Sequence, residues 1–316
     1  MSEATELSSH LPVMPNEVID AWLGDPQGIY VDGTFGRGGH SQLLLNQLDA
    51  QARLYAFDRD PQAITHGTEK FSQDPRISLV NQEFSLIAEV LEGKEKLGKV
   101  NGLLVDFGVS SPQLDSAERG FSFRLDGPLN MKMNPSKGIS AAEWLNSASW
   151  ESIAEALAKY GEEPFAKPIA NSIVKYRETK QLETTLEFAE LVESAIPEAV
   201  KRKLKVHPAT RSFQAVRIKI NDELAEIEKL LERSLDILAP GGRLVVISFH
   251  SLEDRIVKRF MRDASRGSNP NCGIPLREDQ IQRELKLVGK KQRAKPEEIA
   301  INPRARSAIL RVAERT

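Results

Sequence analysis

The glycines and carboxylates near the start of the chain have the types and spacing of a ligand-binding turn. Asp32 opens the stretch DGTFGRGGH at residues 32–40. An apolar β-branched run at 29–31 precedes it and a leucine run at 43–45 follows, which predicts a strand, a tight turn and a helix start. Such a turn presents backbone N–H groups and the positive end of a helix dipole. An ordinary βα turn, whose glycines only relieve crowding, has the same pattern.

Two further acids end predicted strands. Asp58 closes the run 54–58. It follows the glycines by about 20 residues, the separation at which a βαβ unit brings a carboxylate to a ribose diol. Asp106 closes the run 100–106 and leads into a turn that contains Ser110 and Ser111. Because ligands of open α/β sheets bind beyond the carboxyl ends of the strands, we expect the site at this edge.

The choice of cofactor depends on the second glycine of the turn. A dinucleotide fingerprint has the form Gly-x-Gly-x-x-Gly, and its second glycine lets the backbone approach a pyrophosphate. Phe35 stands in that place, which weakens the nicotinamide interpretation. S-adenosylmethionine carries no phosphate and needs carboxylates for its ribose hydroxyls and amino group. The acids at the strand ends are therefore typical of S-adenosylmethionine-dependent methyltransferases.

Composition limits the class of protein. The chain has 316 residues, of which 40% are hydrophobic and 28% charged, enough for one large α/β domain with an insertion or for two modest domains. No apolar run has the roughly 18 residues that span a bilayer. We therefore expect a cytoplasmic protein without membrane contact. The single cysteine, Cys272, excludes an internal disulfide and a multi-cysteine zinc site, and no metal site is predicted.

The periodicity divides the chain into two parts. Residues 1–113 and 207–316 predict an α/β domain with a mostly parallel sheet, and residues 114–206 predict an inserted helical subdomain. Beyond the segments named above, strands are expected at 77–80 and 243–249 and helices at 18–23, from 61, at 222–238 and at 252–262. Residues 283–288 and 307–312 predict a closing antiparallel pair, and 239–242 (APGG) a helix cap.

Several long motifs resemble the bacterial ribosomal RNA small-subunit methyltransferase H (RsmH, also called MraW) family. The resemblance runs essentially from end to end of the chain. It is carried by residues 32–41, 57–61, 106–115, 119–123, 160–163, 207–211, 213–215, 221–224, 247–255 and 302–304. It implies a class I, Rossmann-like fold and S-adenosylmethionine-dependent methylation of N4 of cytosine-1402 in 16S ribosomal RNA. It also implies cofactor contacts at Gly38, Gly39, His40, Asp58, Phe84, Asp106 and Gln113.

One segment departs from the family pattern. Where the family usually has Asp-Met-Arg-Met-Asp after Gly-Pro-Leu, this chain has Asn130, Met131, Lys132, Met133 and Asn134. Two carboxylates become amides and a planar bidentate donor becomes a point charge. If the acids position the target base, activity is weakened or retuned. If they only shape the loop, little changes.

The residues allow a mechanism and an RNA surface. The N4 lone pair of cytosine is conjugated with the ring, so catalysis must orient N4 and accept its hydrogens, for which we predict Asp106, Ser110 and Ser111. Asp106 could instead serve the cofactor. We predict that the RNA phosphates contact Lys201, Arg202, Lys203, His207 and Arg211, although such a charge run is also typical of a solvated helix end. A second basic cluster lies at 290–295.

Three rival classes have distinct signatures. A DNA amino-methyltransferase usually carries Asn/Asp-Pro-Pro-aromatic after the fourth strand, whereas this chain has Asp106-Phe107-Gly108-Val109. A nicotinamide dehydrogenase would not bind S-adenosylmethionine. A non-catalytic RNA-binding module on a methyltransferase fold would follow if the altered segment had cost the activity. The sequence leaves the oligomeric state open between monomer and homodimer.

Overall fold

The computed structural model describes residues 11–267 and 282–316. Cys272 and its loop lie outside these ranges. The chain divides into two compact units, the first formed by residues 1–108 and 224–316 and the second by 109–223. Within the described ranges, no helix is both long enough and apolar enough to cross a bilayer.

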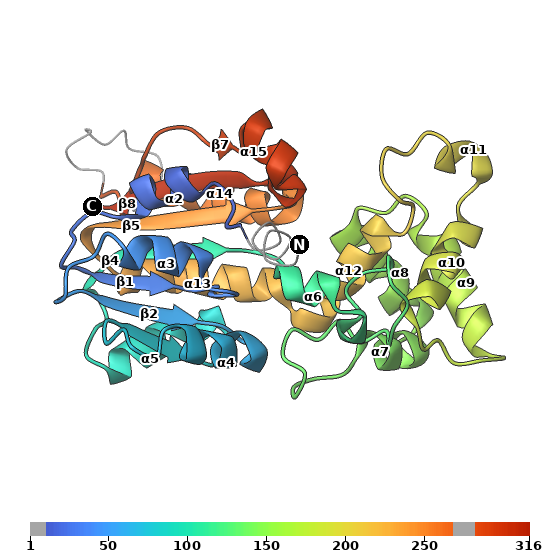
Figure 1. The fold of residues 1–316 in the computed structure, drawn as a ribbon. Coiled ribbons are helices and arrows are strands. Elements are labelled where there is room, and N and C mark those ends of the chain that lie inside the picture. Colours follow the sequence, from blue (N-terminus) through green and yellow to red (C-terminus); the bar gives the residue numbers. More distant parts are fainter. Residues whose placement is uncertain (1–10, 268–281) are drawn as a thin grey trace. The chain divides into compact units, whose positions relative to one another are not determined.

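The first unit is built on one mixed sheet with the strand order β3-β2-β1-β4-β5-β8-β6 (Figure 1), and β7 also pairs with β8. The neighbours from β3 to β5 are parallel, and β8 runs antiparallel to β5, β6 and β7. The predicted sheet and its antiparallel closing pair are confirmed. The strands are β1 Ile29–Asp32, β2 Arg53–Phe57, β3 Ile77–Val80, β4 Val100–Asp106, β5 Leu238–Ser248, β6 Leu285–Leu287, β7 Gln292–Arg293 and β8 Ile309–Arg315.

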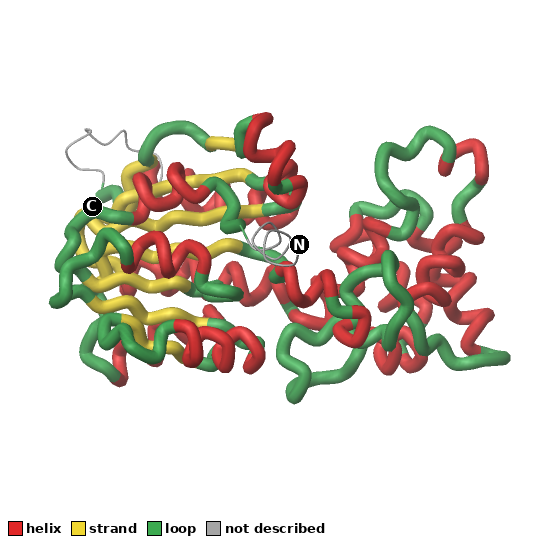
Figure 2. The backbone as a smooth tube through the Cα atoms, in the orientation of Figure 1, coloured by secondary structure: helices red, strands yellow, loops and turns green. Residues whose placement is uncertain are grey.

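Helices cover both faces of this sheet, as Figure 2 shows. Alternate residues of β4 explain why both faces are apolar, because Leu104 enters one core and Leu103 and Val105 enter the other. The first core is covered by α2 Pro15–Trp22, α3 Gly39–Leu45, α4 Pro61–Lys70 and α15 Pro296–Ile301, and the second by α5 Ile87–Gly93, α13 Glu223–Ile237 and α14 Ser251–Arg266. A sheet buried on both faces holds its strand ends rigidly, which suits a binding edge.

The start of β5 differs from the prediction. Residues 239–242 are not a simple helix cap, because β5 begins at Leu238 and these residues bulge from the strand. Leu238 pairs with Val100 and Arg243 with Gly102, so the bulge lies between two paired positions. The Pro-Gly-Gly sequence therefore interrupts the pairing rather than preceding the strand.

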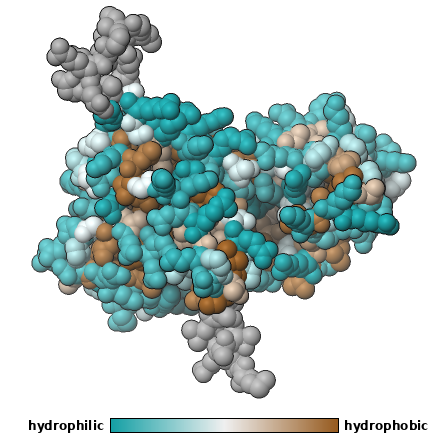
Figure 3. All heavy atoms as spheres, turned by 90° about the horizontal axis from the view of Figure 1, so that it is seen from above, coloured by the Kyte–Doolittle hydropathy of each residue, from teal (hydrophilic) through white to brown (hydrophobic). Residues whose placement is uncertain are grey.

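The second unit is helical and longer than the predicted insertion at both ends, since it begins at 109 and ends at 223. The physical reason is packing: Phe213, Ala215 and Val216 enter the same core as Leu157. Exposed apolar side chains are scattered over a mainly hydrophilic surface (Figure 3). The helices of the second unit are α6 Ser111–Asp115, α7 Ala141–Ser147, α8 Trp150–Gly161, α9 Ala166–Arg177, α10 Thr185–Ala195, α11 Glu198–Lys201 and α12 Thr210–Asn221.

Candidate cofactor-binding site

The carboxyl ends of β1, β2 and β4 bring three acids to one edge of the sheet. In the parallel register Asp32 lies opposite Ala56 of β2 and Leu104 of β4. Asp58 lies two positions after Ala56, and Asp106 lies two positions after Leu104. The predicted convergence of these acids at the ligand edge therefore agrees with the sheet.

The glycine turn needs its glycines for two reasons. Gly38 has φ 68°, a left-handed conformation, and a Cβ there would lie 2.6 Å from Cε2 of Phe35. Phe35 occupies the second glycine's place because its ring is core, packed at 5.9 Å from the ring of Phe71. The ring of Phe35 thus packs against the turn and leaves no room for a side chain at position 38.

Asp58 stabilises the turn by accepting two backbone hydrogen bonds. Its Oδ2 accepts a hydrogen bond from N of Gly36 at 2.7 Å, and its Oδ1 accepts one from N of Asp60 at 2.8 Å. Each carboxylate oxygen can accept a second hydrogen bond, so both remain able to serve a ribose hydroxyl. Burial raises the pKa of Asp58 to about 6.

Asp32, which is buried, and Asp106, whose side chain is 24% exposed, form an acidic pair beside the turn. Asp32 accepts hydrogen bonds from Oγ of Ser41 at 2.6 Å and from N of Thr34 at 3.1 Å, and burial raises its pKa to about 6. Burial, and then the charges of Asp32 and Glu253, raise the pKa of Asp106 well above its usual value. The buried Oδ1 of Asp106 has no hydrogen-bond partner among the described residues. A buried acceptor of this kind is satisfied by a donor from a ligand or a water molecule, or by a proton.

His40 is neutral and oriented. Burial lowers the pKa of its imidazole to about 4, and its Nε2 lies 2.8 Å from the carbonyl oxygen of Val13. The carbonyl can only accept, so Nε2 carries the hydrogen and Nδ1 carries a lone pair. Nδ1 lies 3.9 Å from Oδ2 of Asp106, which at neutral pH is a contact and not an ion pair. Nδ1 is therefore an acceptor that faces the same edge.

Phe84 opens the 3₁₀ turn η1, Phe84–Leu86, directly after β3. Its ring is half-buried and its centroid lies 5.7 Å from that of Phe107. Two aromatic rings thus flank the strand ends. Phe107 is core, and the half-buried ring of Phe84, packed against it, offers the apolar surface that a purine ring requires.

This set of donors and acceptors fits S-adenosylmethionine better than a dinucleotide. Asp32, Asp58, Asp106 and Nδ1 of His40 are acceptors in a poorly solvated place, and they would repel a pyrophosphate. They suit ribose hydroxyls, an ammonium group and a sulfonium centre, all of which donate hydrogens or carry positive charge. The acceptors of the site therefore favour S-adenosylmethionine over a dinucleotide more strongly than the glycine pattern does.

Gly39 begins α3 in the first unit, and the other remaining predicted residues lie in the second unit. N of Ser110 donates to Oε1 of Gln113 at 3.0 Å, so these two cap α6 locally, and Ser111 is its first residue. Their meeting with Asp106 stays a prediction.

The predicted RNA residues make local contacts. Lys201 and Arg202 pair with Glu198 at 2.9 and 3.7 Å. Nη1 of Arg211 donates to the carbonyl of Glu162 at 3.3 Å. Nε2 of His207 lies 2.7 Å from Oε1 of Glu193, and its ring stacks on Phe123 at 4.2 Å between centroids. These side chains are ordered by neighbours of their own unit, and their contact with RNA stays a prediction.

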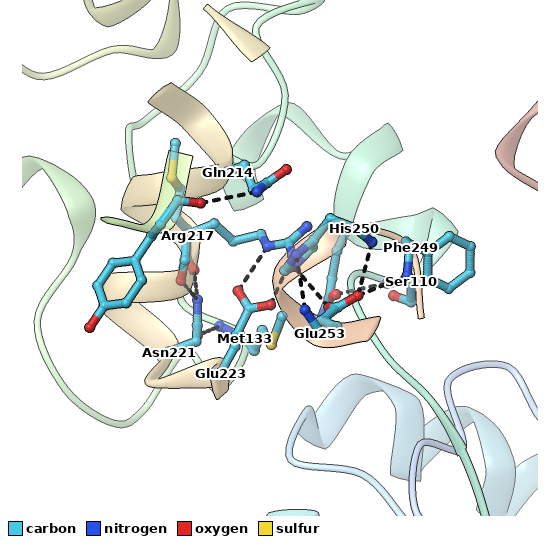
Figure 4. Close-up of polar contacts among 12 residues, drawn as sticks. Ser110, Met133, Gln214, Arg217, Asn221, Glu223, Phe249, His250 and Glu253 are labelled. Atoms are coloured by element: carbon cyan, nitrogen blue, oxygen red, sulfur yellow. Dashed lines mark hydrogen bonds and ion pairs between the residues drawn. The ribbon is translucent and has the colours of Figure 1, made fainter. Parts of the chain in front are cut away.

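The altered segment is a structured loop, and Figure 4 shows the contact of its Met133 with Asn221. Oδ1 of Asn130 accepts from N of Lys132 at 3.1 Å, and Oδ1 of Asn134 from N of Ser136 at 3.0 Å. Asn221 contacts both sides, accepting from N of Met133 and donating to the carbonyl of Met131, each at 2.8 Å. An aspartate offers the same acceptor oxygens, so at these two positions the amides preserve the turns. This favours the interpretation in which the acids only shape the loop.

Sequence reasoning missed the buried polar groups that support the acids. Ser41 and Thr34 flank the glycines, and Oγ1 of Thr34 accepts from N of Asp106 at 2.6 Å. The signal for them was present as hydroxyl residues on either side of the turn. Glu253 is fully buried and accepts from the backbone of Phe249 and His250 (Figure 4). Its place three residues after His250 is a capping-box spacing, which was the available signal.

The open, mostly parallel sheet with an antiparallel β8, and acids at the ends of its central strands, define a class I methyltransferase. The chain belongs to the MraW methylase family, whose family model matches residues 7–316. Its cofactor is S-adenosylmethionine.

The chain has low sequence identity and low TM-scores to solved structures. A putative rRNA methylase from Clostridium thermocellum is 10% identical with a TM-score of 0.42, covering 100% of this chain and 97% of that one. An rRNA methylase from Streptococcus thermophilus is 12% identical with a TM-score of 0.38, covering 95% and 92%. A putative methyltransferase from Streptococcus mutans in complex with SAH is 14% identical with a TM-score of 0.37, covering 100% and 99%. The assignment rests on the family model and the sheet, not on these structures.

The raised pKa of Asp58 predicts a pH dependence of cofactor binding. Because the free protein begins to take up a proton near pH 6, lowering the pH from 7 to 5 should weaken binding of S-adenosylmethionine, since a protonated carboxyl is a weaker acceptor for the ribose hydroxyls. The loss approaches tenfold per pH unit below the pKa for one proton. Calorimetric titration from pH 5 to 7 measures it. The Asp58→Asn variant should bind more weakly throughout and lose the part of the dependence that Asp58 contributes, while Asp32, whose pKa is also raised to about 6, still titrates. An affinity that stays constant in the wild type contradicts the assignment of Asp58.

Proposed function

We propose that this protein methylates N4 of cytosine-1402 in 16S ribosomal RNA, with S-adenosylmethionine as methyl donor. The observation that supports this best is the buried Oδ1 of Asp106 at the end of β4, which has no hydrogen-bond partner among the described residues, in a chain matched by the MraW methylase family over residues 7–316. An acceptor with a raised pKa is what an exocyclic amine needs when it loses a proton.

The proposed roles follow from the chemistry of the amine. S-adenosylmethionine supplies an electrophilic methyl group. Asp106 accepts one N4–H, directs the nitrogen lone pair, and takes the proton that N4 loses as its new C–N bond forms. Ser110 and Ser111 are proposed to accept the second N4–H or to hold the base. Gly38, Gly39, His40, Asp58, Phe84 and Gln113 are proposed to bind the cofactor, with Asp58 at the ribose and His40 at the amino group.

The second unit is proposed to bind RNA. A cytosine must leave its stack to enter a pocket at a sheet edge, so a surface is needed that holds the surrounding backbone. Lys203 and Arg202 are exposed on the segment after α11, next to Lys201. The proposed phosphate contacts are Lys201, Arg202, Lys203, His207 and Arg211.

Replacing Lys201, Arg202 and Lys203 by Ala together should weaken RNA binding and flatten its salt dependence. Each lost phosphate contact removes roughly 0.7 to 0.9 from the slope of log K against log salt, so three remove about 2 to 3. Filter binding at several salt concentrations measures the slope. The control replaces Lys94, Lys96 and Lys99, a lysine-rich loop of the first unit. A slope unchanged in the first variant removes this segment from the RNA surface.

Transfer of labelled methyl groups tests the proposed function against its rivals. Purified protein is incubated with methyl-labelled S-adenosylmethionine and small-subunit RNA, naked or assembled with ribosomal proteins, and separately with cytosine-containing DNA. Label in small-subunit RNA, recovered as N4-methylcytidine, is the expected result. Label only in DNA indicates an amino-methyltransferase of DNA, and RNA binding without label indicates a non-catalytic module. Either result overturns the proposal.

A further inference from the structure

A buried carboxylate on α13 connects segments that lie far apart in the sequence. Oε2 of Glu226 accepts a hydrogen bond from Oγ of Ser85 at 2.5 Å and one from Nη2 of Arg59 at 3.4 Å. The side chains of Glu226 and Arg59 are only 12% and 13% exposed. Ser85 and Arg59 are 141 and 167 residues away from Glu226 in the chain, so no local pattern encodes these two contacts.

This cluster lies against the proposed cofactor site. Arg59 directly follows Asp58, and its guanidinium lies 5.8 Å from the centroid of the Phe84 ring. Ser85 directly follows Phe84 and is buried. One oxygen of Glu226 thus binds both Arg59, which is next to the proposed ribose ligand Asp58, and Ser85, which is next to the proposed aromatic contact Phe84.

The turn that carries Phe84 needs such support. The turn η1 is a single 3₁₀ turn of three residues, its N-cap makes no side-chain hydrogen bond, and Leu86 is exposed. Short charge-assisted O–H···O⁻ bonds are among the stronger hydrogen bonds in proteins. Losing the carboxylate would release Ser85 and leave the Arg59 guanidinium, which is poorly solvated, without this anion.

We propose that Glu226 is a positioning residue for the cofactor: through Ser85 and Arg59 it holds Phe84 in place as the wall beside the adenine ring. In this proposal Glu226 acts only through Ser85 and Arg59 and contacts neither the cofactor nor the RNA. Its removal therefore weakens binding of the adenosine part and leaves the methyl-transfer step unchanged once the cofactor is saturating. The inference rests on the proposed cofactor site.

The test measures binding of S-adenosylhomocysteine and of methylthioadenosine, which lacks the amino-acid part, by calorimetry. Glu226→Ala should weaken both by about tenfold, since both contain adenosine, and should raise KM for S-adenosylmethionine without lowering kcat. Glu226→Gln keeps an acceptor for Ser85 and should lose less. The control is Lys229→Ala, which removes an exposed lysine 3.5 Å from Oε1 of Glu226 and should change neither affinity.

A double-mutant cycle separates positioning from general stability. Ser85→Ala alone should weaken adenosine binding, and adding it to Glu226→Ala should cost little more, because the two groups act through one contact. Fully additive losses, or a loss of kcat in place of affinity, overturn the inference. If the wild type binds neither ligand, the cofactor site itself fails. If the wild type binds both and Glu226→Ala binds as well, only the role of Glu226 fails.

Discussion

Replacing Asp106 by Asn should lower kcat for methyl transfer about 100-fold while S-adenosylmethionine still binds. Asn has nearly the shape of Asp but cannot take up the N4 proton, and its Nδ2 offers donors where the amine needs acceptors. General-base catalysis typically contributes 10²- to 10⁴-fold, so about 100-fold is the lower end of that range. The orphaned Oδ1 of Asp106 is the structural reason to expect a catalytic rather than a structural loss.

The measurement compares single-turnover rates and cofactor affinity in the same variant. Asp20→Asn, at an exposed position of α2, serves as the matched control and should behave as the wild type. A normal rate at saturating cofactor, with only the affinity reduced, would contradict the catalytic role and assign Asp106 to the cofactor.

Replacing Gly120 by Ala should destabilise the second unit by at least about 3 kcal/mol. Gly120 has φ 70°, and a Cβ there would lie 2.3 Å from the carbonyl oxygen of Pro128 and 2.5 Å from N of Asn130. Both obstructing atoms are backbone, so relief requires the loop to move. That loop is also held by Arg119, whose Nη2 donates to the carbonyls of Lys132 and Met133.

Gly138→Ala is a close control for this substitution. Gly138 has φ 66°, nearly the same conformation, but no atom lies within 4 Å of its Cβ position. It should therefore cost only the left-handed penalty of about 1 kcal/mol. Urea unfolding of both variants isolates the steric contribution. Equal losses in the two variants would contradict the packing described for Gly120.

Much of the first unit could be predicted because its strands are short apolar runs with clear ends. β3 and β4 have the predicted bounds, and β6 and β8 near the C-terminus form the predicted antiparallel pair. The limits of the second unit could not be predicted in the same way. The apolar face of α12 fits either unit as a pattern, and only its packing with the core around Leu157 decides.

The candidate site shows the same division between local and distant information. The acids at 32, 58 and 106 were found because strand ends and glycine turns are local features. The neutral state of His40 depends on its burial in the fold, and its tautomer depends on the carbonyl of Val13, 27 residues away. The support from Glu226 depends on still more distant contacts. The candidate acids could therefore be identified from the sequence. Their protonation states and the contacts that support the site depend on the fold.

The most direct test of the central claim locates the methyl group on the RNA. Small-subunit RNA is treated with protein and S-adenosylmethionine, digested, and the fragments are analysed by mass spectrometry. The account predicts one added methyl group in the fragment that contains cytosine-1402, identified as N4-methylcytidine, and no addition when that cytosine is replaced by uridine. A methyl group on another nucleotide, or on another atom of this cytosine, would contradict it.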